Sequence, residues 1–198
     1  GLALGDERIC VEAAAAGFED ALVSFYEDYM AVEEGAGDLA DTRFALRPDT
    51  ARGFFVLLER LARRAAPPAV VKGQVTGPVT FALGLRRQDG RAIFYDLHLR
   101  DAAVKLLALK ARFQIRRLKA VGAPRVVFLD EPALAGYGSS DMISISPEEI
   151  GAALGEVIAA VHAEGGLAGV HVCANTDWSL ILNSAADIVN FDAFTYLE

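Results

Sequence analysis

Cysteine, histidine and tryptophan are scarce in this sequence. Its 198 residues include two cysteines, three histidines and one tryptophan. Cys10 and Cys173 are too few and too far apart to indicate a disulfide framework, so we expect reduced thiols and a cytoplasmic protein. The scarcity draws attention to one stretch, GVHVCANTDW at residues 169–178, in which His171 and Cys173 are separated by a single residue.

An excess of positive charge and long hydrophobic runs are also missing. The formal net charge is −8, and the one basic stretch, residues 105–119, has its apolar residues at helical spacing. We therefore expect no nucleic-acid partner. No apolar run approaches the ~18 residues needed to cross a bilayer, and no basic-then-apolar leader opens the chain, so we expect no membrane partner.

Apolar residues are plentiful enough to build a core, since 53% of the chain is hydrophobic and 23% is charged. Residues 11–35 and the segment that follows Asp49 predict two helices, which make residues 1–66 a helical lead-in. Residues 67–198 then alternate between strands and helices, and SPEE from Ser146 predicts the start of one of these helices. We expect residues 1–198 to form a single domain.

Four strands are predicted, in VVKGQVT, RVVFLD, LAGVHVC and ADIVNFD. They are apolar throughout rather than alternating, which indicates burial on both faces and a parallel sheet. Each ends in polar residues, namely Gln74 and Thr76, Asp130 and Glu131, His171 and Cys173, and Asn190 and Asp192.

Polar residues at strand ends are typical of a (β/α)8 TIM barrel, whose active sites gather at that rim. A doubly wound sheet also binds ligands there, although no glycine-rich phosphate fingerprint follows any strand. A full barrel needs about 250 residues. We therefore predict an α/β fold that is an incomplete TIM barrel, with about four central strands present and strands missing at both ends.

His171 and Cys173 are the first candidates for chemistry. In an extended strand their side chains point to the same face, and imidazole and thiolate are both zinc ligands. Asp192, at the end of the next predicted strand, is a candidate third ligand. The alternative is a small buried thiol beside a hydrogen-bonded histidine with no metal.

Asp130 and Glu131 are the second candidates. Because they are adjacent, only one of them can face the mouth of a barrel, where a carboxylate can bind an ammonium group or act as acid or base. The alternative is that one caps the following segment and the other is solvated. Thr76, in GQVTGP, is a further candidate for a substrate contact, against the alternative of a plain strand-ending turn. Asn175 is another, beside Trp178, which can wall a pocket or simply fill the core.

Taken together, KGQVTGPVTF, VVFLDEPAL, GVHVCANTDW and ADIVNFD resemble the catalytic barrel of cobalamin-independent methionine synthase. That barrel belongs to a superfamily with uroporphyrinogen decarboxylase and corrinoid-linked methyltransferases, and the continuation after HxC resembles short, single-barrel relatives. The resemblance covers residues 69–192, and its four motifs occur in the same order at predicted strand ends.

The resemblance implies a TIM barrel with zinc at its C-terminal rim. His171 and Cys173 match two of the family's metal ligands. The next ligand in the family is a glutamate one strand later, where this chain has the shorter Asp192, and the last is a cysteine further along than this chain extends. Asp130 matches an acid that helps to hold the amino group of homocysteine, and Thr76 lies in a rim segment near the substrate.

The function implied is a zinc-dependent methyltransferase that moves a methyl group to a thiol such as homocysteine. The donor in the family is a methylated folate or a methylated corrinoid protein. One alternative is a uroporphyrinogen decarboxylase-like relative without metal, which would need arginines at the rim. Another is a barrel that binds a ligand without catalysis.

Overall fold

A parallel sheet forms the centre of the computed structural model, which describes residues 2–5, 8–142 and 144–197. Its strand order is β3-β5-β6-β7. The register sets Thr76 opposite Asp130, and Asp130 opposite His171, so the predicted polar strand ends lie at one edge. The strands are β3 (Val71–Thr76), β5 (Arg125–Asp130), β6 (Leu167–Val172) and β7 (Ile188–Phe191).

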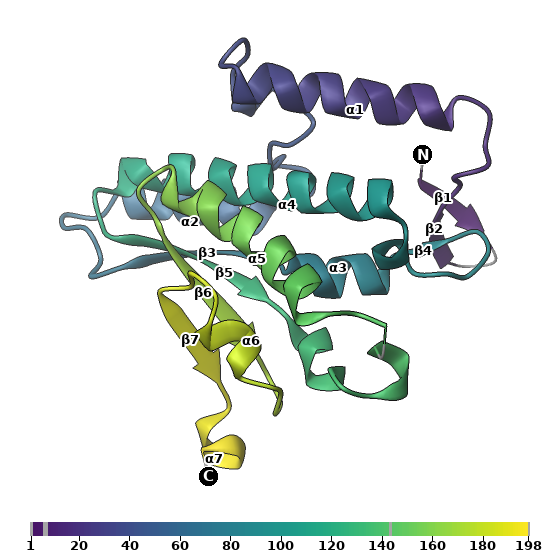
Figure 1. Cartoon of the computed structure of the whole chain (residues 1–198). Helices are drawn as coiled ribbons and strands as arrows, with labels where there is room; N and C mark the ends of the chain where they lie inside the picture. Colours follow the sequence, from purple (N-terminus) through teal and green to yellow (C-terminus); the bar gives the residue numbers. More distant parts are fainter. Residues whose placement is uncertain (1, 6–7, 143, 198) are drawn as a thin grey trace.

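Helices connect these parallel strands and cover one face of the sheet (Figure 1). The connecting helices are α3 (Pro78–Gly84), α4 (Leu97–Leu118), α5 (Pro147–His162) and α6 (Ser179–Leu182). The predicted start of α5 is confirmed, because Ser146 and Glu149 form a capping box there. Short 3-10 helices lie at Leu39–Asp41, Ile93–Tyr95, Lys119–Val121, Pro132–Gly136 and Ser140–Met142.

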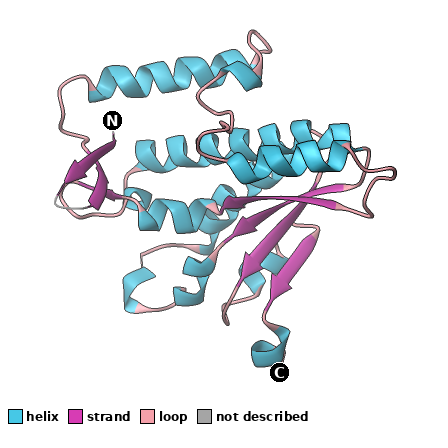
Figure 2. Ribbon diagram, turned by 180° about the vertical axis from the view of Figure 1, so that it is seen from behind, coloured by secondary structure: helices cyan, strands magenta, loops and turns pink. Residues whose placement is uncertain are grey.

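The two faces of the sheet differ in cover. On the helix-covered face, Val127, Leu129 and Val170 are fully buried against α4 and α5. The opposite face, which we call the open face, has no helix of the described residues lying across it (Figure 2). Its side chains are Lys72, Gln74, Thr76, Val126, Phe128, Asp130, Leu167, His171, Ile188 and Asn190.

Burial on both faces of every strand was therefore the wrong expectation. The residues of β3 alternate between buried and exposed, because its even-numbered side chains lie on the open face. The fold is α/β and the larger sheet is parallel, as predicted. Within the described residues, β3 and β7 are the two edge strands of this sheet and do not pair with each other.

A side chain protects the β3 edge. The amide of Gln114, on α4, accepts a hydrogen bond from Gln74 N and donates one to Gln74 O, both at 2.9 Å. Gln114 is 3% exposed, so these are hydrogen bonds made in the protein interior. The amide takes the place that a neighbouring strand would have at this position, which reduces the tendency of an open edge to pair with another chain.

The lead-in is not wholly helical, which corrects the expectation for residues 1–66. Strands β1 (Leu2–Gly5) and β2 (Arg8–Val11) form an antiparallel pair, and β2 pairs with β4 (Arg86–Arg87). Helix α1 (Phe18–Glu33) begins after Gly17, whose φ of 81° is left-handed, rather than at Val11. Helix α2 (Arg52–Ala62) has Ala51 at its N-cap, so the prediction that Asp49 caps this helix is wrong.

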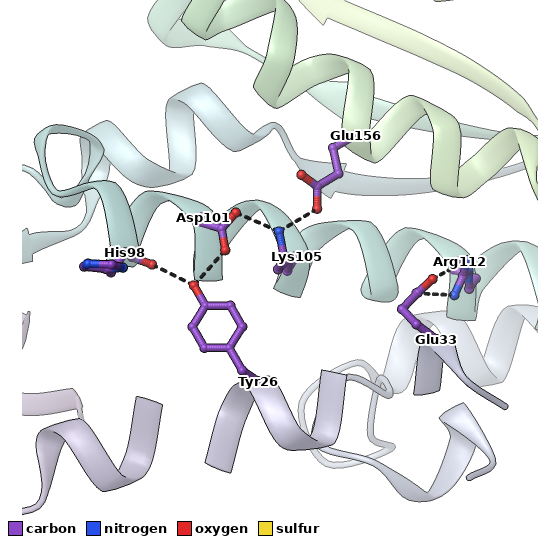
Figure 3. Close-up of polar contacts among 7 residues, drawn as sticks. All are labelled: Tyr26, Glu33, His98, Asp101, Lys105, Arg112 and Glu156. Atoms are coloured by element: carbon purple, nitrogen blue, oxygen red, sulfur yellow. Dashed lines mark hydrogen bonds and ion pairs between the residues drawn. The ribbon is translucent and has the colours of Figure 1, made fainter. Parts of the chain in front are cut away.

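Helix α1 lies outside α4 and is anchored by polar contacts (Figure 3). Tyr26 Oη donates to Asp101 Oδ2 at 2.7 Å, and Lys105 Nζ pairs with Asp101 Oδ1 at 2.7 Å and with Glu156 Oε1 at 3.3 Å. Burial and the Asp101 carboxylate raise the pKa of the Tyr26 hydroxyl well above its usual range. The network ties α1 to α4 and α5.

Among the helices that the structure describes, none has the length and apolar content that a membrane span requires.

Candidate functional site

A hollow of about 490 Å³ lies on the open face of the sheet. It is formed by side chains from all four parallel strands, so residues distant in the sequence meet there. Asp130 and His171 were predicted from the sequence, and both line the hollow. The full lining is Lys72, Gln74, Phe128, Asp130, His171 and Asn190.

Three of these side chains form a polar chain across the sheet. Lys72 Nζ donates to Gln74 Oε1 at 2.7 Å, and Gln74 Nε2 donates to Asp130 Oδ2. The Lys72 ammonium also lies 4.9 Å from the centroid of the Phe128 ring, a cation–π distance. Lys72 was not recognised as a site residue from the sequence, although a lysine within an apolar parallel strand is a signal that could have been used.

His171 is oriented by a backbone carbonyl. Its Nδ1 lies 3.2 Å from Asn190 O. A carbonyl oxygen only accepts hydrogen bonds, so in the neutral ring this contact places the proton on Nδ1 and the lone pair on Nε2. Metal-binding histidines are commonly held in this way, and Nε2 makes no hydrogen bond with the residues that the structure describes.

Cys173 follows the last residue of β6 and is exposed with a free thiol. It lies two residues beyond His171, and residues at that spacing share a face where the strand geometry continues. Among the described residues no hydrogen bond or disulfide engages its sulfur. An accessible thiol at a strand end is free to bind a soft metal ion or to react.

The Asp192 carboxylate accepts hydrogen bonds from the residues that directly follow it. It is the N-cap of α7 (Ala193–Tyr196), where Oδ1 accepts from Phe194 N at 3.1 Å and from Thr195 N at 3.3 Å. Oδ2 accepts from Thr195 Oγ1 at 2.6 Å. These hydrogen bonds lower the pKa of the Asp192 carboxyl, with the Thr195 hydroxyl contributing most. Both oxygens of the predicted third zinc ligand therefore have partners.

The residues fit zinc in their chemistry and only in part in their arrangement. Imidazole nitrogen, thiolate and carboxylate are the ligands that zinc prefers, and it usually takes four. Within residues 2–5, 8–142 and 144–197, no three His, Cys, Asp or Glu side chains gather closely enough to hold an ion. His171 and Cys173 are of residue types that zinc takes as ligands, whereas the Asp192 carboxylate is engaged at the start of α7.

Glu131 does not face the hollow, which corrects its expected contact with substrate. It is 0% exposed, and Oε1 accepts from Val79 N at 2.9 Å. Oε2 accepts from Thr80 N at 2.7 Å and from Thr80 Oγ1 at 2.6 Å. Burial raises the pKa of this carboxyl to about 7, although the three hydrogen bonds act in the opposite direction. Glu131 thus holds the start of α3.

The glycine of the TGP sequence makes room for this carboxylate. A Cβ built on Gly77 would lie 2.2 Å from Glu131 Cδ, so a larger residue cannot occupy that position without displacing Glu131. Gly77 N also donates to Asp130 O at 2.8 Å, and Glu131 N donates to His171 O at 2.8 Å. These bonds extend the strand pairing beyond Asp130 and hold β3, β5 and β6 together at the site.

Thr76 and Asn175 lie near the same edge without lining the hollow. Thr76 is exposed on the open face, opposite Asp130. Asn175 Oδ1 accepts from Thr176 N at 3.0 Å and from Trp178 Nε1 at 3.1 Å, which shapes the loop after β6. Asp130 and His171 therefore lie together in the hollow, and Thr76 is exposed beside them. Asn175 instead makes hydrogen bonds within the loop after β6.

In comparisons with known proteins, no family model, no curated protein and no solved structure matches the chain.

Proposed function

We propose that this protein is a zinc-dependent methyltransferase that moves a methyl group to a thiol such as homocysteine. The observation that carries the proposal is the placement of His171 and Cys173. The imidazole lines the hollow with Nε2 unengaged by the described residues, and the exposed thiol follows two residues later. The resemblance of the strand-end motifs to methionine synthase supports the same chemistry.

The proposed architecture is a TIM barrel of which this chain contributes about four strands. Such a barrel repeats one parallel strand followed by one outer helix, and the four parallel strands of this sheet are likewise joined by helices on one face. The open face would be the barrel interior, and the hollow would lie toward its C-terminal rim. Active sites of TIM barrels are built at that rim.

His171, Cys173 and Asp192 would hold the zinc ion. Bound zinc lowers the pKa of a coordinated thiol, so that the thiolate, which is the reactive form, is present at neutral pH. Asn190 O keeps the His171 ring in the tautomer that leaves Nε2 free for the metal. Asp130 would bind the ammonium group of the substrate, close to Thr76. The donor would be a methyl-folate or a methyl-corrinoid protein, in the cytoplasm.

Zinc content tests the first part of the proposal. In Cys173→Ala and in His171→Ala we expect the purified full chain to lose zinc, measured by elemental analysis. Cys10→Ala and His98→Asn are matched controls, since Cys10 lies on β2 in the smaller sheet and His98 is an exposed residue on α4. Circular dichroism should show the same helix content throughout. Equal zinc in the parent protein and in Cys173→Ala would contradict the metal site.

Methyl transfer tests the second part. The zinc-loaded protein is incubated with homocysteine and either methyl-folate or a methylated corrinoid, and methionine is measured. We expect methionine with one donor, and its loss in Cys173→Ala but not in Cys10→Ala. A protein that contains zinc but forms no methionine with either donor would contradict the proposed reaction, although not the proposed metal site.

One observation favours a second candidate, a barrel that binds a small ligand without metal. Among the described residues no third ligand joins His171 and Cys173. Such a protein would be zinc-free and would still bind a ligand in the hollow. A decarboxylase-like site for a polycarboxylate is less well supported, because among the described residues Lys72 is the only lysine or arginine that lines the hollow.

A further inference from the structure

We propose that Gln74 is a positioning residue for Asp130, and that Lys72 fixes the direction in which the Gln74 amide points. The inference rests on the proposed function, because Asp130 is the residue expected to bind the ammonium group of the substrate. The observation behind the proposal is the pair of hydrogen bonds that joins Lys72 to Gln74 and Gln74 to Asp130 in the hollow.

Lys72 and Asp130, which are both charged, determine the orientation of the Gln74 amide between them. A lysine ammonium only donates hydrogen bonds, and an ionised carboxylate only accepts them. The Gln74 amide therefore places Oε1 toward Lys72, at 2.7 Å from Nζ, and Nε2 toward Asp130. A flipped amide would meet each partner with the wrong group, so a single orientation is stable.

The backbone of Gln74 is fixed independently of its side chain. Gln114, buried on α4, holds both Gln74 N and Gln74 O at 2.9 Å. Lys72 and Gln74 are two residues apart on β3, so both side chains lie on the open face. Asp130 is on the paired strand β5, opposite Thr76. The amide thus reaches Asp130 from a rigid position on the neighbouring strand.

This arrangement leaves one carboxylate oxygen for a ligand. Asp130 Oδ2 is engaged by Gln74, whereas Oδ1 makes no hydrogen bond or ion pair with the described residues. The Lys72 ammonium polarises the amide, which strengthens the hydrogen bond that the amide donates. Asp130 is therefore held with Oδ1 available for a cationic group, and binding requires little reorganisation.

The contact itself is tested by NMR, without reference to function. The side-chain 15N–1H signals of Gln74 are identified by their absence in Gln74→Met. We expect Lys72→Met and Asp130→Asn each to shift these signals, because each removes one partner of the amide. Lys119→Met removes an exposed lysine elsewhere and should leave them in place. Unchanged signals in both Lys72→Met and Asp130→Asn would overturn the proposal.

The positioning role is tested by a double-mutant cycle in the zinc-loaded full chain. Homocysteine affinity is measured calorimetrically for the parent, Gln74→Met, Asp130→Asn and the double variant. We expect Gln74→Met to weaken binding about tenfold in the parent background and less than about twofold in the Asp130→Asn background. KM should rise with kcat nearly unchanged, and zinc content should stay constant in all four proteins.

The outcomes separate the two proposals. Equal weakening by Gln74→Met in both backgrounds would show that Gln74 acts independently of Asp130 and would overturn the positioning role. No homocysteine binding by the parent protein would instead overturn the proposed function, and with it the role of Asp130 toward substrate. In that case the NMR signals would still decide whether Lys72 and Gln74 hold Asp130.

Discussion

The helix-covered face and the open face of the larger sheet differ in character, although their residues alternate along the same strands. Leu129 and Val170 are fully buried beneath α4 and α5. Their immediate neighbours Asp130 and His171 lie on the open face and line the hollow. A shift of one residue along a strand therefore changes a side chain from core packing to a candidate functional role.

The residues that stabilise the sheet and the residues of the hollow can therefore be altered separately in this protein. The apolar contacts that stabilise the sheet are on the covered face, and the groups that can bind a ligand are on the other. Three residues are exceptions: Val126 is apolar and buried on the open face, and Glu131 and Gln114 are polar and buried.

Leu129→Ala and Leu167→Ala compare the two faces directly. Both are strand leucines, but Leu129 is 0% exposed on the covered face and Leu167 is 43% exposed on the open face. We expect Leu129→Ala to lower the free energy of unfolding by about 2–5 kcal/mol, because it leaves a cavity in the core. Leu167→Ala should cost less than about 1 kcal/mol. Urea denaturation measures both values, and equal losses would contradict the division.

Glu131 should make stability depend on pH. Its pKa is raised to about 7 in the folded protein by burial, so between about pH 4.5 and 7 the folded chain binds more protons than the unfolded chain. The free energy of unfolding should therefore fall as pH rises through this window, by at most about 3 kcal/mol.

The measurement is urea denaturation at pH 5 and pH 8 for the parent protein, Glu131→Gln and Glu148→Gln. The loss on going to pH 8 should be much smaller in Glu131→Gln, which cannot ionise at this position. Glu148 is an exposed glutamate on α5 and serves as the control. The same pH dependence in Glu131→Gln and in the parent would contradict the prediction.

Gln114→Leu tests the buried amide at the sheet edge. It removes both hydrogen bonds to the Gln74 backbone and leaves those groups without their partner. We expect a loss of about 1–3 kcal/mol in the free energy of unfolding. Amide hydrogen exchange should also become faster at Gln74. Gln88→Leu is the control, because it removes an exposed hydrogen bond, from Ala13 N, rather than two buried ones; equal losses in the two variants would argue against a special role for the edge.

Cys173→Ala should have the smallest effect on stability. The thiol is exposed, so in metal-free protein the free energy of unfolding should change by less than about 0.5 kcal/mol. Urea denaturation in the presence of a chelator measures this value. A loss comparable to that of Leu129→Ala would show that Cys173 belongs to the core, contrary to its place beyond β6.

Sequence reasoning succeeded where the signal is local. The four parallel strands follow from apolar, β-branched runs, and the start of α5 follows from the capping box at Ser146. It failed at residues 11–17, where an alanine run predicts helix. There Gly17 takes a left-handed conformation and Val11 pairs in β2. Helix propensity is weak compared with such tertiary contacts.

For the site, the sequence suggested which strand ends carry polar residues but not what each side chain contacts. Asp130 and His171 meet as expected because parallel strands bring their C-terminal ends together. Glu131 and Asp192 were expected at the same place, yet both accept hydrogen bonds from helix starts. Carboxylates that satisfy free N–H groups at helix starts are common, and sequence spacing does not distinguish them from ligands.

The sequence alone determined the parallel α/β arrangement and the polar residues at the C-terminal ends of the strands, because the hydrophobic pattern and helix caps depend on residues close together in the sequence. Only the tertiary structure decided which face of the sheet is covered, and that Lys72 and Gln74 join Asp130 in the hollow. The contact between Gln74 and Asp130 links residues 56 positions apart, and it depends on strand register and on helix packing, which exist only once the chain has folded.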